Sequence, residues 1–304
     1  MAAGTERGEY RLAAMESPTS APQCQPIWLV ANASSGSNSD EALDALIGGC
    51  THFGLNVVHT LRFPEDAAPT PRQLDEAGIA LLAIFAGDGT VNAVIHALAG
   101  WGGQVLVLPG GTKNLLAKRL HGDVPAEEII ARQAAGAAKA VRPPIIRTAS
   151  GEALAELMAG PGTAWRDVRE ALRETDLAAI ASGAVSAIGE STNGAMLVCT
   201  DPPLGRVDGY PLLVVEPADD GLHITAYYAE SAGDVVQQGI ALLRQDFRNG
   251  PHEEIGVADS VTLSDPQGGP VRYLLDGEAV EGSASETFSI APCAVDLLAT
   301  RDDI

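Results

Sequence analysis

The tetrapeptide Gly87–Thr90, with the sequence GDGT, carries the clearest chemical signal in the chain. It follows a continuous apolar stretch from Ile79 to Phe85, and the residues after it, 91–98, suit a helix. Glycines between a buried strand and a helix let a phosphate chain approach backbone N–H groups and the helix N-terminus. The carboxylate of Asp88 repels an anion, so it predicts a divalent cation or an ordered water between the two. Taken alone, the segment fits a tight turn with a polar cap equally well.

Two further loops have the same placement after an apolar run. The segment Asn32–Gly36 follows Ile27–Ala31, and Gly110–Asn114 follows Val105–Leu108. If these strands are parallel, the three loops meet at the carboxyl edge of one sheet, where open α/β sheets bind ligands. The GxxxxGK[ST] pattern is absent, and Asn92 stands where a dinucleotide fingerprint has its third glycine. The loops therefore predict a phosphate site of another kind.

The elements that must position these loops change in character along the chain. Up to about residue 142, apolar runs alternate with helical segments, which predicts an α/β domain with a mostly parallel sheet. The segment Thr70–Gln73 is a predicted helix start, because Thr can cap, Pro suits the first helical position and Gln can return the capping hydrogen bond. A helix is expected at 165–188. Beyond Gly194, short β-like runs separated by turns and interrupted by one helix expected at 234–247 predict an antiparallel β-sandwich. The expected units are a disordered tail at 1–24, an α/β domain at 25–145 and a β-rich domain at 146–304, whose last segment is free to return to the first domain.

Composition and charge argue against several classes of function. The chain has 304 residues and a net charge of −21, which argues against a general nucleic-acid binder because such proteins need a broad basic surface. No apolar run approaches the roughly 18 residues of a membrane span, and the charged N-terminus does not resemble a secretory signal. The four scattered cysteines suit free thiols in a reducing compartment. We therefore expect a cytoplasmic protein whose contact with the inner membrane face is peripheral.

The motifs in combination resemble a known family. The set NxxSG at Asn32–Gly36, GDGT at Gly87–Thr90 and GGTxN at Gly110–Asn114 is similar to the catalytic domain of diacylglycerol and sphingosine kinases, especially soluble bacterial lipid kinases. Far downstream, Leu275–Glu278 resembles the family's DGE segment. The resemblance covers about residues 26–300. It implies a three-layer α/β domain, a β-sandwich domain and an active site in the cleft between them.

The resemblance also implies roles for single residues. Glu278 corresponds to the family's proton acceptor, and Asp276 would share one face of a strand with it if the segment is extended. Two neighbouring carboxylates can raise the pKa of one of them, which suits a general base, and Asp88 is the third expected catalytic carboxylate. Pro217, Asp220 and Leu222 match a structural Mg²⁺ site of bacterial members. The expected nucleotide contacts are Asn32, Ser35, Gly36, Thr60, Gly87, Asp88, Gly89, Thr90, Asn92, Gly111 and Thr112.

These observations predict an ATP- and Mg²⁺-dependent kinase that transfers the γ-phosphoryl group to a hydroxyl of a diacylglycerol-like or sphingoid lipid at the membrane surface. The segment Lys113–Arg147 holds seven basic and three acidic residues, a positive zone that could bind ATP or anionic lipid headgroups. Where the family often has an acidic residue after GTxN, this chain has Leu115. A kinase of a soluble alcohol and a non-catalytic nucleotide-binding regulatory protein are the alternatives, and homodimerisation is left open.

Overall fold

Apolar runs of the first half of the chain form the strands of a six-stranded sheet. The computed structural model describes residues 24–32, 39–160, 196–227 and 252–301. The strand order is β2-β1-β3-β4-β18-β5, and all neighbours are parallel except β18 and β5. The bounds are Gln25–Ala31 for β1, Leu55–Arg62 for β2, Leu81–Ala86 for β3, Gln104–Pro109 for β4, Lys139–Val141 for β5 and Asp296–Ala299 for β18. Ser35, Gly36, the helices expected at 165–188 and 234–247, and the expected tail apart from Cys24 lie outside the described residues.

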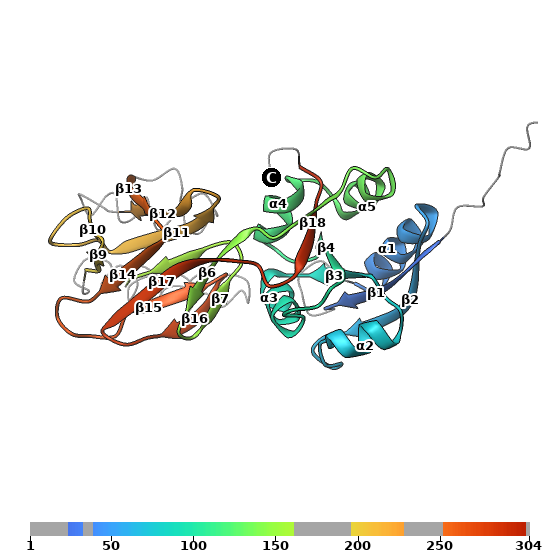
Figure 1. The fold of residues 1–304 in the computed structure, drawn as a ribbon, viewed down its shortest axis with the longest axis horizontal. Coiled ribbons are helices and arrows are strands. Elements are labelled where there is room, and N and C mark those ends of the chain that lie inside the picture. Colours follow the sequence, from blue (N-terminus) through green and yellow to red (C-terminus); the bar gives the residue numbers. More distant parts are fainter. Residues whose placement is uncertain (1–23, 33–38, 161–195, 228–251, 302–304) are drawn as a thin grey trace, which may run out of the picture.

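Helices cover both faces of this sheet (Figure 1). Every residue of β3 is buried, because Leu82 and Ile84 pack into the core on one face while Leu81 and Ala83 pack into the core on the other. The first core is shared with α2 (Pro71–Glu76), α3 (Asp88–Ala97) and α4 (Leu115–His121). The second core is shared with α1 (Asp40–His52) and α5 (Ala126–Ala134). The mostly parallel α/β sheet that the alternating pattern predicts is thus present, with the three layers that the family resemblance implies.

The starts of two helices show where the local sequence was sufficient to predict a helix boundary and where it was not. Thr70 caps α2 with the expected capping box, in which its side chain and that of Gln73 exchange hydrogen bonds with the backbone. By contrast, α3 begins at Asp88 with Gly87 as its N-cap, not at residue 91. The glycine-rich turn expected up to Thr90 is therefore already helical from Asp88. A carboxylate is favourable in this first turn because the N-terminus of a helix carries partial positive charge.

The second half of the chain forms two six-stranded antiparallel sheets packed face to face. One has the order β10-β9-β14-β17-β6-β7 and the other β13-β12-β11-β8-β15-β16. Their shared core includes a T-shaped contact between Tyr273 and Phe288, one from each sheet, with ring centroids 5.2 Å apart. The antiparallel sandwich expected from the sequence is thus present. The bounds are Pro144–Thr148 (β6), Gly151–Ala153 (β7), Leu157–Ala159 (β8), Val198–Asp201 (β9), Pro203–Leu204 (β10), Leu212–Ala218 (β11), Gly221–Tyr227 (β12), His252–Ala258 (β13), Ser260–Ser264 (β14), Arg272–Leu275 (β15), Glu278–Glu281 (β16) and Ser285–Pro292 (β17).

The chain crosses between the two domains twice. It leaves the first sheet between β5 and β6, and it returns between β17 and β18 (Figure 1). Arg142, on the first crossing, and Asp296, the first residue of β18 after the second crossing, form an ion pair of 2.5 Å. Strand β18 lies between β4 and β5, so the first sheet contains a segment more than 150 residues distant from β5 in the sequence.

Candidate active site

The loops that follow β1, β3 and β4 converge at the carboxyl edge of the first sheet. The Asn32 side-chain amide donates to the hydroxyl of Thr90 at 2.8 Å, which connects the end of β1 to the first turn of α3. A Cβ atom at Gly111 would lie only 2.5 Å from the Cα of Gly87, so the loops after β3 and β4 touch backbone to backbone. Only glycine at position 111 permits that contact.

The loop after β4 is held in shape by Asn114. This residue has a left-handed backbone conformation, with φ of 53°, and it is the N-cap of α4. Its side-chain oxygen accepts from the Gly111 N–H at 2.7 Å, and its amide donates to the Gly111 carbonyl at 2.9 Å. Thr112, between the two, is exposed toward solvent. The loop therefore presents its backbone with the geometry already fixed.

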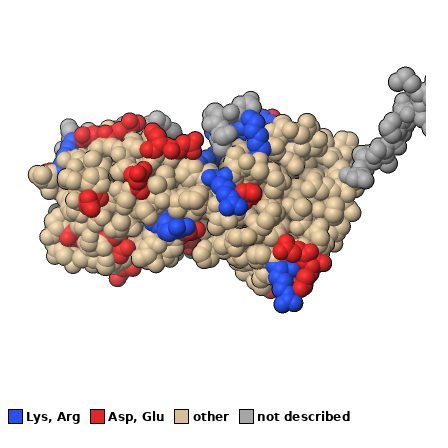
Figure 2. All heavy atoms as spheres, viewed as in Figure 1, with Lys and Arg blue, Asp and Glu red and all other residues tan. Residues whose placement is uncertain are grey.

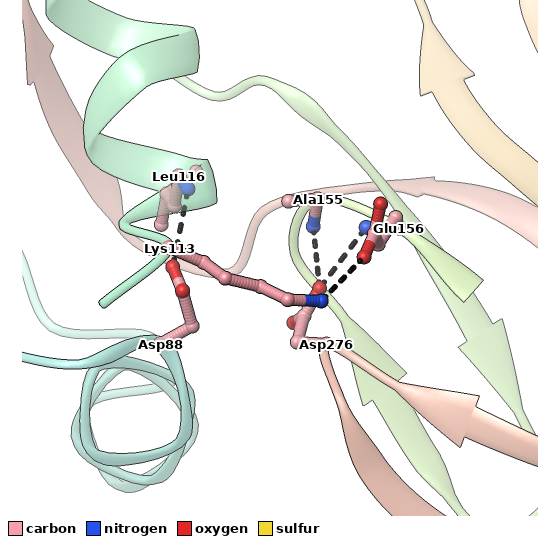
Figure 3. A network of polar contacts seen from close by, with 6 residues as sticks. All are labelled: Asp88, Lys113, Leu116, Ala155, Glu156 and Asp276. Atoms are coloured by element: carbon pink, nitrogen blue, oxygen red, sulfur yellow. Dashed lines mark hydrogen bonds and ion pairs between the residues drawn. The ribbon is translucent and has the colours of Figure 1, made fainter. Parts of the chain in front are cut away.

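Asp88 lies at the meeting point of two helix starts. It is the first residue of α3, and its Oδ1 accepts from the N–H of Leu116 in the first turn of α4 at 3.3 Å (Figure 3). Burial, together with the nearby carboxylate of Asp276, raises the pKa of the Asp88 carboxyl to about 6. The backbone hydrogen bonds and Lys113 act in the opposite direction. Asp88 is thus a carboxylate whose negative charge is incompletely compensated.

Asp276 occupies a different position from the one expected. It lies in the turn between β15 and β16 with φ of 48°, followed by Gly277 with φ of 95°. The expectation that it shares one face of an extended strand with Glu278 is wrong, because the chain reverses direction between the two.

The surroundings of Asp276 indicate a structural role. Its Oδ1 accepts from the backbone N–H groups of Ala155 and Glu156 at 2.9 and 3.0 Å (Figure 3). Its Oδ2 accepts from the backbone N–H of Leu154 at 2.7 Å and from the Asn92 amide at 3.0 Å. Burial raises the pKa of Asp276, and these four donors oppose the shift. With its acceptor positions occupied in this way, Asp276 holds the connection between β7 and β8 against α3.

The side chain of Glu278 reaches the carboxyl edge of the first sheet, where the glycine-containing loops lie. It is the first residue of β16 and is exposed, and a Cβ atom at Gly89 would lie 3.2 Å from its Oε1. The carboxylate therefore approaches the first turn of α3 from the β-sandwich. Residues 89 and 278, almost 190 positions apart in sequence, are neighbours in the fold.

Two expected nucleotide contacts lie elsewhere around this edge. The Asn92 amide donates to the Glu152 carbonyl at 2.8 Å as well as to Asp276, so it bridges the two domains. Thr60 is half-buried on β2, opposite Leu29 of β1, two residues before β2 ends. The nucleotide-binding role of both residues stays a prediction.

The expected structural Mg²⁺ site falls on the hairpin of β11 and β12. Pro217 and Leu222 are register partners there, and Asp220 lies in the turn with its Oδ1 2.7 Å from Nε2 of His223. This contact with the histidine lowers the pKa of Asp220. Within the described residues, no group of three or more His, Cys, Asp or Glu side chains is arranged to hold a metal ion. A metal on this hairpin would depend on backbone carbonyls and a single carboxylate, and the site stays a prediction.

Sequence reasoning missed the ion pair between Lys113 and Glu156. Nζ of Lys113, in the loop after β4, lies 3.5 Å from Oε1 of Glu156, which precedes β8 (Figure 3). Lys113 was counted as one member of the positive zone, whereas no motif singled out Glu156. The two residues become neighbours only when the fold brings the β7–β8 connection against the first domain.

The positive zone itself is largely neutralised by local acids. Lys118 pairs with Asp123 at 3.2 Å and Arg132 with Glu128 at 2.5 Å. Further along, Arg147 pairs with Glu152 at 2.9 Å. On the face drawn in Figure 2, basic side chains lie beside acidic ones, and acidic side chains line the upper edge of the β-rich domain. The segment therefore does not form one continuous basic patch on this face.

Comparison with known proteins gives the class of this fold and site. Residues 26–143 match the family model of the diacylglycerol kinase catalytic domain. A solved structure from Bacillus anthracis str. Sterne, of a protein provisionally assigned as a diacylglycerol kinase, has 15% identity and a TM-score of 0.60, and the match covers 93% of this chain and 98% of that one. A diacylglycerol kinase structure from the same strain has 16% identity and a TM-score of 0.57, covering 92% and 98%. At these identities the likeness shows the two-domain fold. The sequence has no match among curated proteins.

The family model matches the part of the chain that holds the loops after β1, β3 and β4. Within the ranges that the structure covers, no helix combines the length and the apolar character that a membrane crossing requires.

Proposed function

We propose that the chain is a lipid kinase that uses Mg²⁺ and ATP to phosphorylate a hydroxyl of a diacylglycerol-like or sphingoid lipid. The observation that carries the proposal is the approach of the Glu278 carboxylate to Gly89. It puts a potential proton acceptor from the β-sandwich beside the loops that would hold the phosphates. The family of residues 26–143 supports diacylglycerol as the first acceptor to test.

Three features of the carboxyl edge support triphosphate binding. The N-terminus of α3, a helix of ten residues, offers backbone N–H groups and the positive end of its dipole. Gly87 and Gly111 expose their backbones because neither carries a side chain. The hydrogen bonds of Asn114 keep the loop after β4 fixed, so little conformational entropy is lost when a ligand binds.

Asp88 fits a divalent cation. Its carboxyl is mostly buried, repelled by Asp276, and has a pKa raised to about 6, so a cation beside it would relieve an unfavourable charge. Mg²⁺ in phosphoryl-transfer sites is commonly held by one or two carboxylates together with phosphate oxygens and water. Bound there, Mg²⁺ would neutralise charge on the transferring phosphate. Asp276, whose oxygens accept four hydrogen bonds, is not needed as a ligand.

In the proposed reaction the acceptor hydroxyl attacks the γ-phosphorus. The new bond joins the acceptor oxygen to phosphorus, the bond to the β-phosphate oxygen breaks, and ADP leaves. The hydroxyl proton passes to the Glu278 carboxylate, which is exposed and can lie toward an acceptor entering from solvent. The loop backbone at the carboxyl edge of the first sheet orients the phosphate for in-line attack.

The test is phosphoryl transfer from labelled ATP to diacylglycerol or sphingosine in mixed micelles, with the product identified by mass spectrometry. We expect a lipid heavier by one phosphate, produced only with Mg²⁺ present. Glu278→Gln should reduce transfer by about 100-fold or more, in line with losing a general base, while ATP affinity stays within about twofold.

Other outcomes of the same experiment would reject the proposal. Transfer only to water-soluble alcohols would indicate a kinase of a soluble acceptor, and ATP binding without transfer to any acceptor would indicate a regulatory module. Because the basic side chains are mostly ion-paired, micelles with and without anionic lipid should be compared, and we expect little stimulation by the anionic lipid.

A further inference from the structure

The Lys113 side chain crosses from the α/β domain to the β-sandwich at the candidate site. It starts in the loop after β4, and its ammonium lies near the Glu156 carboxylate and near the turn that holds Asp276 (Figure 3). The Lys113 side chain is 20% exposed and that of Glu156 is 4% exposed. Lysine can reposition a compact charge over several ångströms because its stem is long and flexible.

The charge around Lys113 is predominantly negative. Arg119 also interacts with Asp276, but its guanidinium donates to the carbonyls of Pro144 and Leu154 at 2.8 and 3.0 Å, so it is engaged in holding the crossing between the domains. Lys113 also favours the ionised form of Asp88. The carboxylates gathered at this place are Asp88, Glu156, Asp276 and Glu278. A nucleotide phosphate entering among them needs a cation to offset this charge.

The pair with Glu156 is loose. Its Nζ to Oε1 distance is 3.5 Å, whereas charge-assisted hydrogen bonds between an ammonium and a carboxylate are about 2.7–2.9 Å long. Because the pair is this long, little electrostatic stabilisation is lost when the lysine moves to another anion. A phosphate at the N-terminus of α3 would be such an anion, because Lys113 is already close enough to affect Asp88 at that terminus.

We propose that Lys113 binds the terminal phosphate of the nucleotide and that Glu156 holds this lysine in place while the site is empty. This inference rests on the proposed function, since it assigns the site a nucleotide. Glu156 is then a positioning residue that competes with the phosphate for the same ammonium. The competition predicts that removing the two partners changes nucleotide affinity in opposite directions.

A purely structural ion pair predicts something else. If Lys113 and Glu156 only hold the two domains together, removing either partner loosens the same contact. Nucleotide affinity would then fall in both variants, or change in neither. The sign of the Glu156 effect therefore separates the two roles.

The experiment measures the affinities of ATP and ADP by titration calorimetry with Mg²⁺ for the full chain and its variants. We expect Lys113→Met to weaken ATP binding by about tenfold and ADP binding by less, because the lost contact is to the terminal γ-phosphate of ATP, which ADP lacks. Glu156→Gln should tighten ATP binding several-fold. In the Lys113→Met background, Glu156→Gln should have no effect on ATP affinity, because the lysine that it releases is gone.

Three controls make the outcome decisive. Lys118→Met removes the same charge from α4 at a surface pair with Asp123 and should leave both affinities unchanged. Lys113→Gln repeats the charge removal with a polar side chain if Lys113→Met folds poorly, and thermal unfolding of every variant reports folding. Equal weakening by the Lys113 and Glu156 variants, or no change in either, would overturn this inference alone. A wild-type chain that binds neither nucleotide would overturn the proposed function together with it.

Discussion

The carboxylate of Glu278 and the backbone of Gly89 are in near contact across the two domains, with 3.2 Å between Oε1 and the position of a Cβ atom at residue 89. One residue comes from the first turn of α3 and the other from the start of β16. The α/β domain therefore supplies the phosphate-facing backbone and the β-sandwich supplies the carboxylate. Neither domain contains the candidate site alone.

Gly89→Ala tests this contact directly. The added methyl group would force the Glu278 carboxylate away by several tenths of an ångström, and we expect phosphoryl transfer to fall by about 10- to 100-fold, because small misplacements of reacting groups are costly. Stability should not fall, since Gly→Ala in a helix stabilises by about 0.4–1 kcal/mol where the backbone permits it. Kinetics and thermal unfolding check the two parts. Gly48→Ala, in α1 with nothing within 4 Å of the added carbon, is the matched control and should leave transfer unchanged.

Asp276→Asn should destabilise the fold. The amide group would bring N–H donors to a place where four donors already converge, so at least one of them loses its acceptor. We expect a loss of about 2–4 kcal/mol in the free energy of unfolding, measured with urea. Glu278→Gln, an exposed neighbour two residues away, should change stability by less than about 0.5 kcal/mol. Equal stability of the Asp276→Asn chain and the wild type would contradict the structural role of Asp276.

The raised pKa of Asp88, about 6, predicts pH-dependent binding of the Mg–nucleotide. Above this pH the carboxyl is ionised and can face the cation, and below it the proton competes. We expect affinity to fall by about tenfold between pH 7 and pH 5, as measured by calorimetry. The Asp88→Asn chain should bind weakly with no such pH dependence. A slope that persists unchanged in that variant would exclude Asp88 as its source.

His121 makes a second pH prediction, for folding. The residue is buried in α4 with Nδ1 3.0 Å from the Thr300 hydroxyl, and burial lowers its pKa from 6.5 to about 4. Between these two values the unfolded chain binds a proton that the folded chain does not, so this histidine makes stability fall as pH falls from 6.5 to 4. The full effect is of the order of 3 kcal/mol.

His121→Gln isolates this contribution. Urea unfolding at several pH values should show a smaller loss on acidification in the variant than in the wild type. The comparison must be between the two chains, because burial of Asp88 acts in the opposite direction: a carboxyl with a raised pKa takes up its proton in the folded state first, which favours folding as pH falls from about 6 to 3.8. Parallel curves for the two chains would contradict the assignment to His121.

The sequence predicted those parts of the fold that depend on local pattern. The buried strand before Gly87 has an unbroken apolar run, and the cap of α2 uses only the four residues Thr70–Gln73, so both were correctly identified. The strands β7 and β8 have three residues each, which is too short for periodicity to be seen. Strand β16 has only four residues and begins and ends with glutamate, so it contains no apolar run.

In the candidate site too, features set by the local sequence could be predicted, whereas features set by distant residues could not. The glycine loops could be found because their spacing after apolar runs is local. The conformation of Asp276 could not, because it is fixed by N–H groups at residues 154–156, about 120 positions earlier. The same holds for Lys113, whose partner Glu156 lies in the other domain. Long-range polar contacts leave no periodic signal in the sequence.

Strand β18 has a consequence for how the protein is made. It pairs in parallel with β4 and antiparallel with β5, so the position between β4 and the edge strand β5 stays unfilled until residues 296–299 are available. During translation, β5 cannot join its sheet until the entire β-sandwich has left the ribosome. The first domain is therefore completed only after the second has been synthesised, and cutting the chain between β17 and β18 would take from β5 the strand it pairs with and remove Leu297 and Ala299 from the core of the first domain.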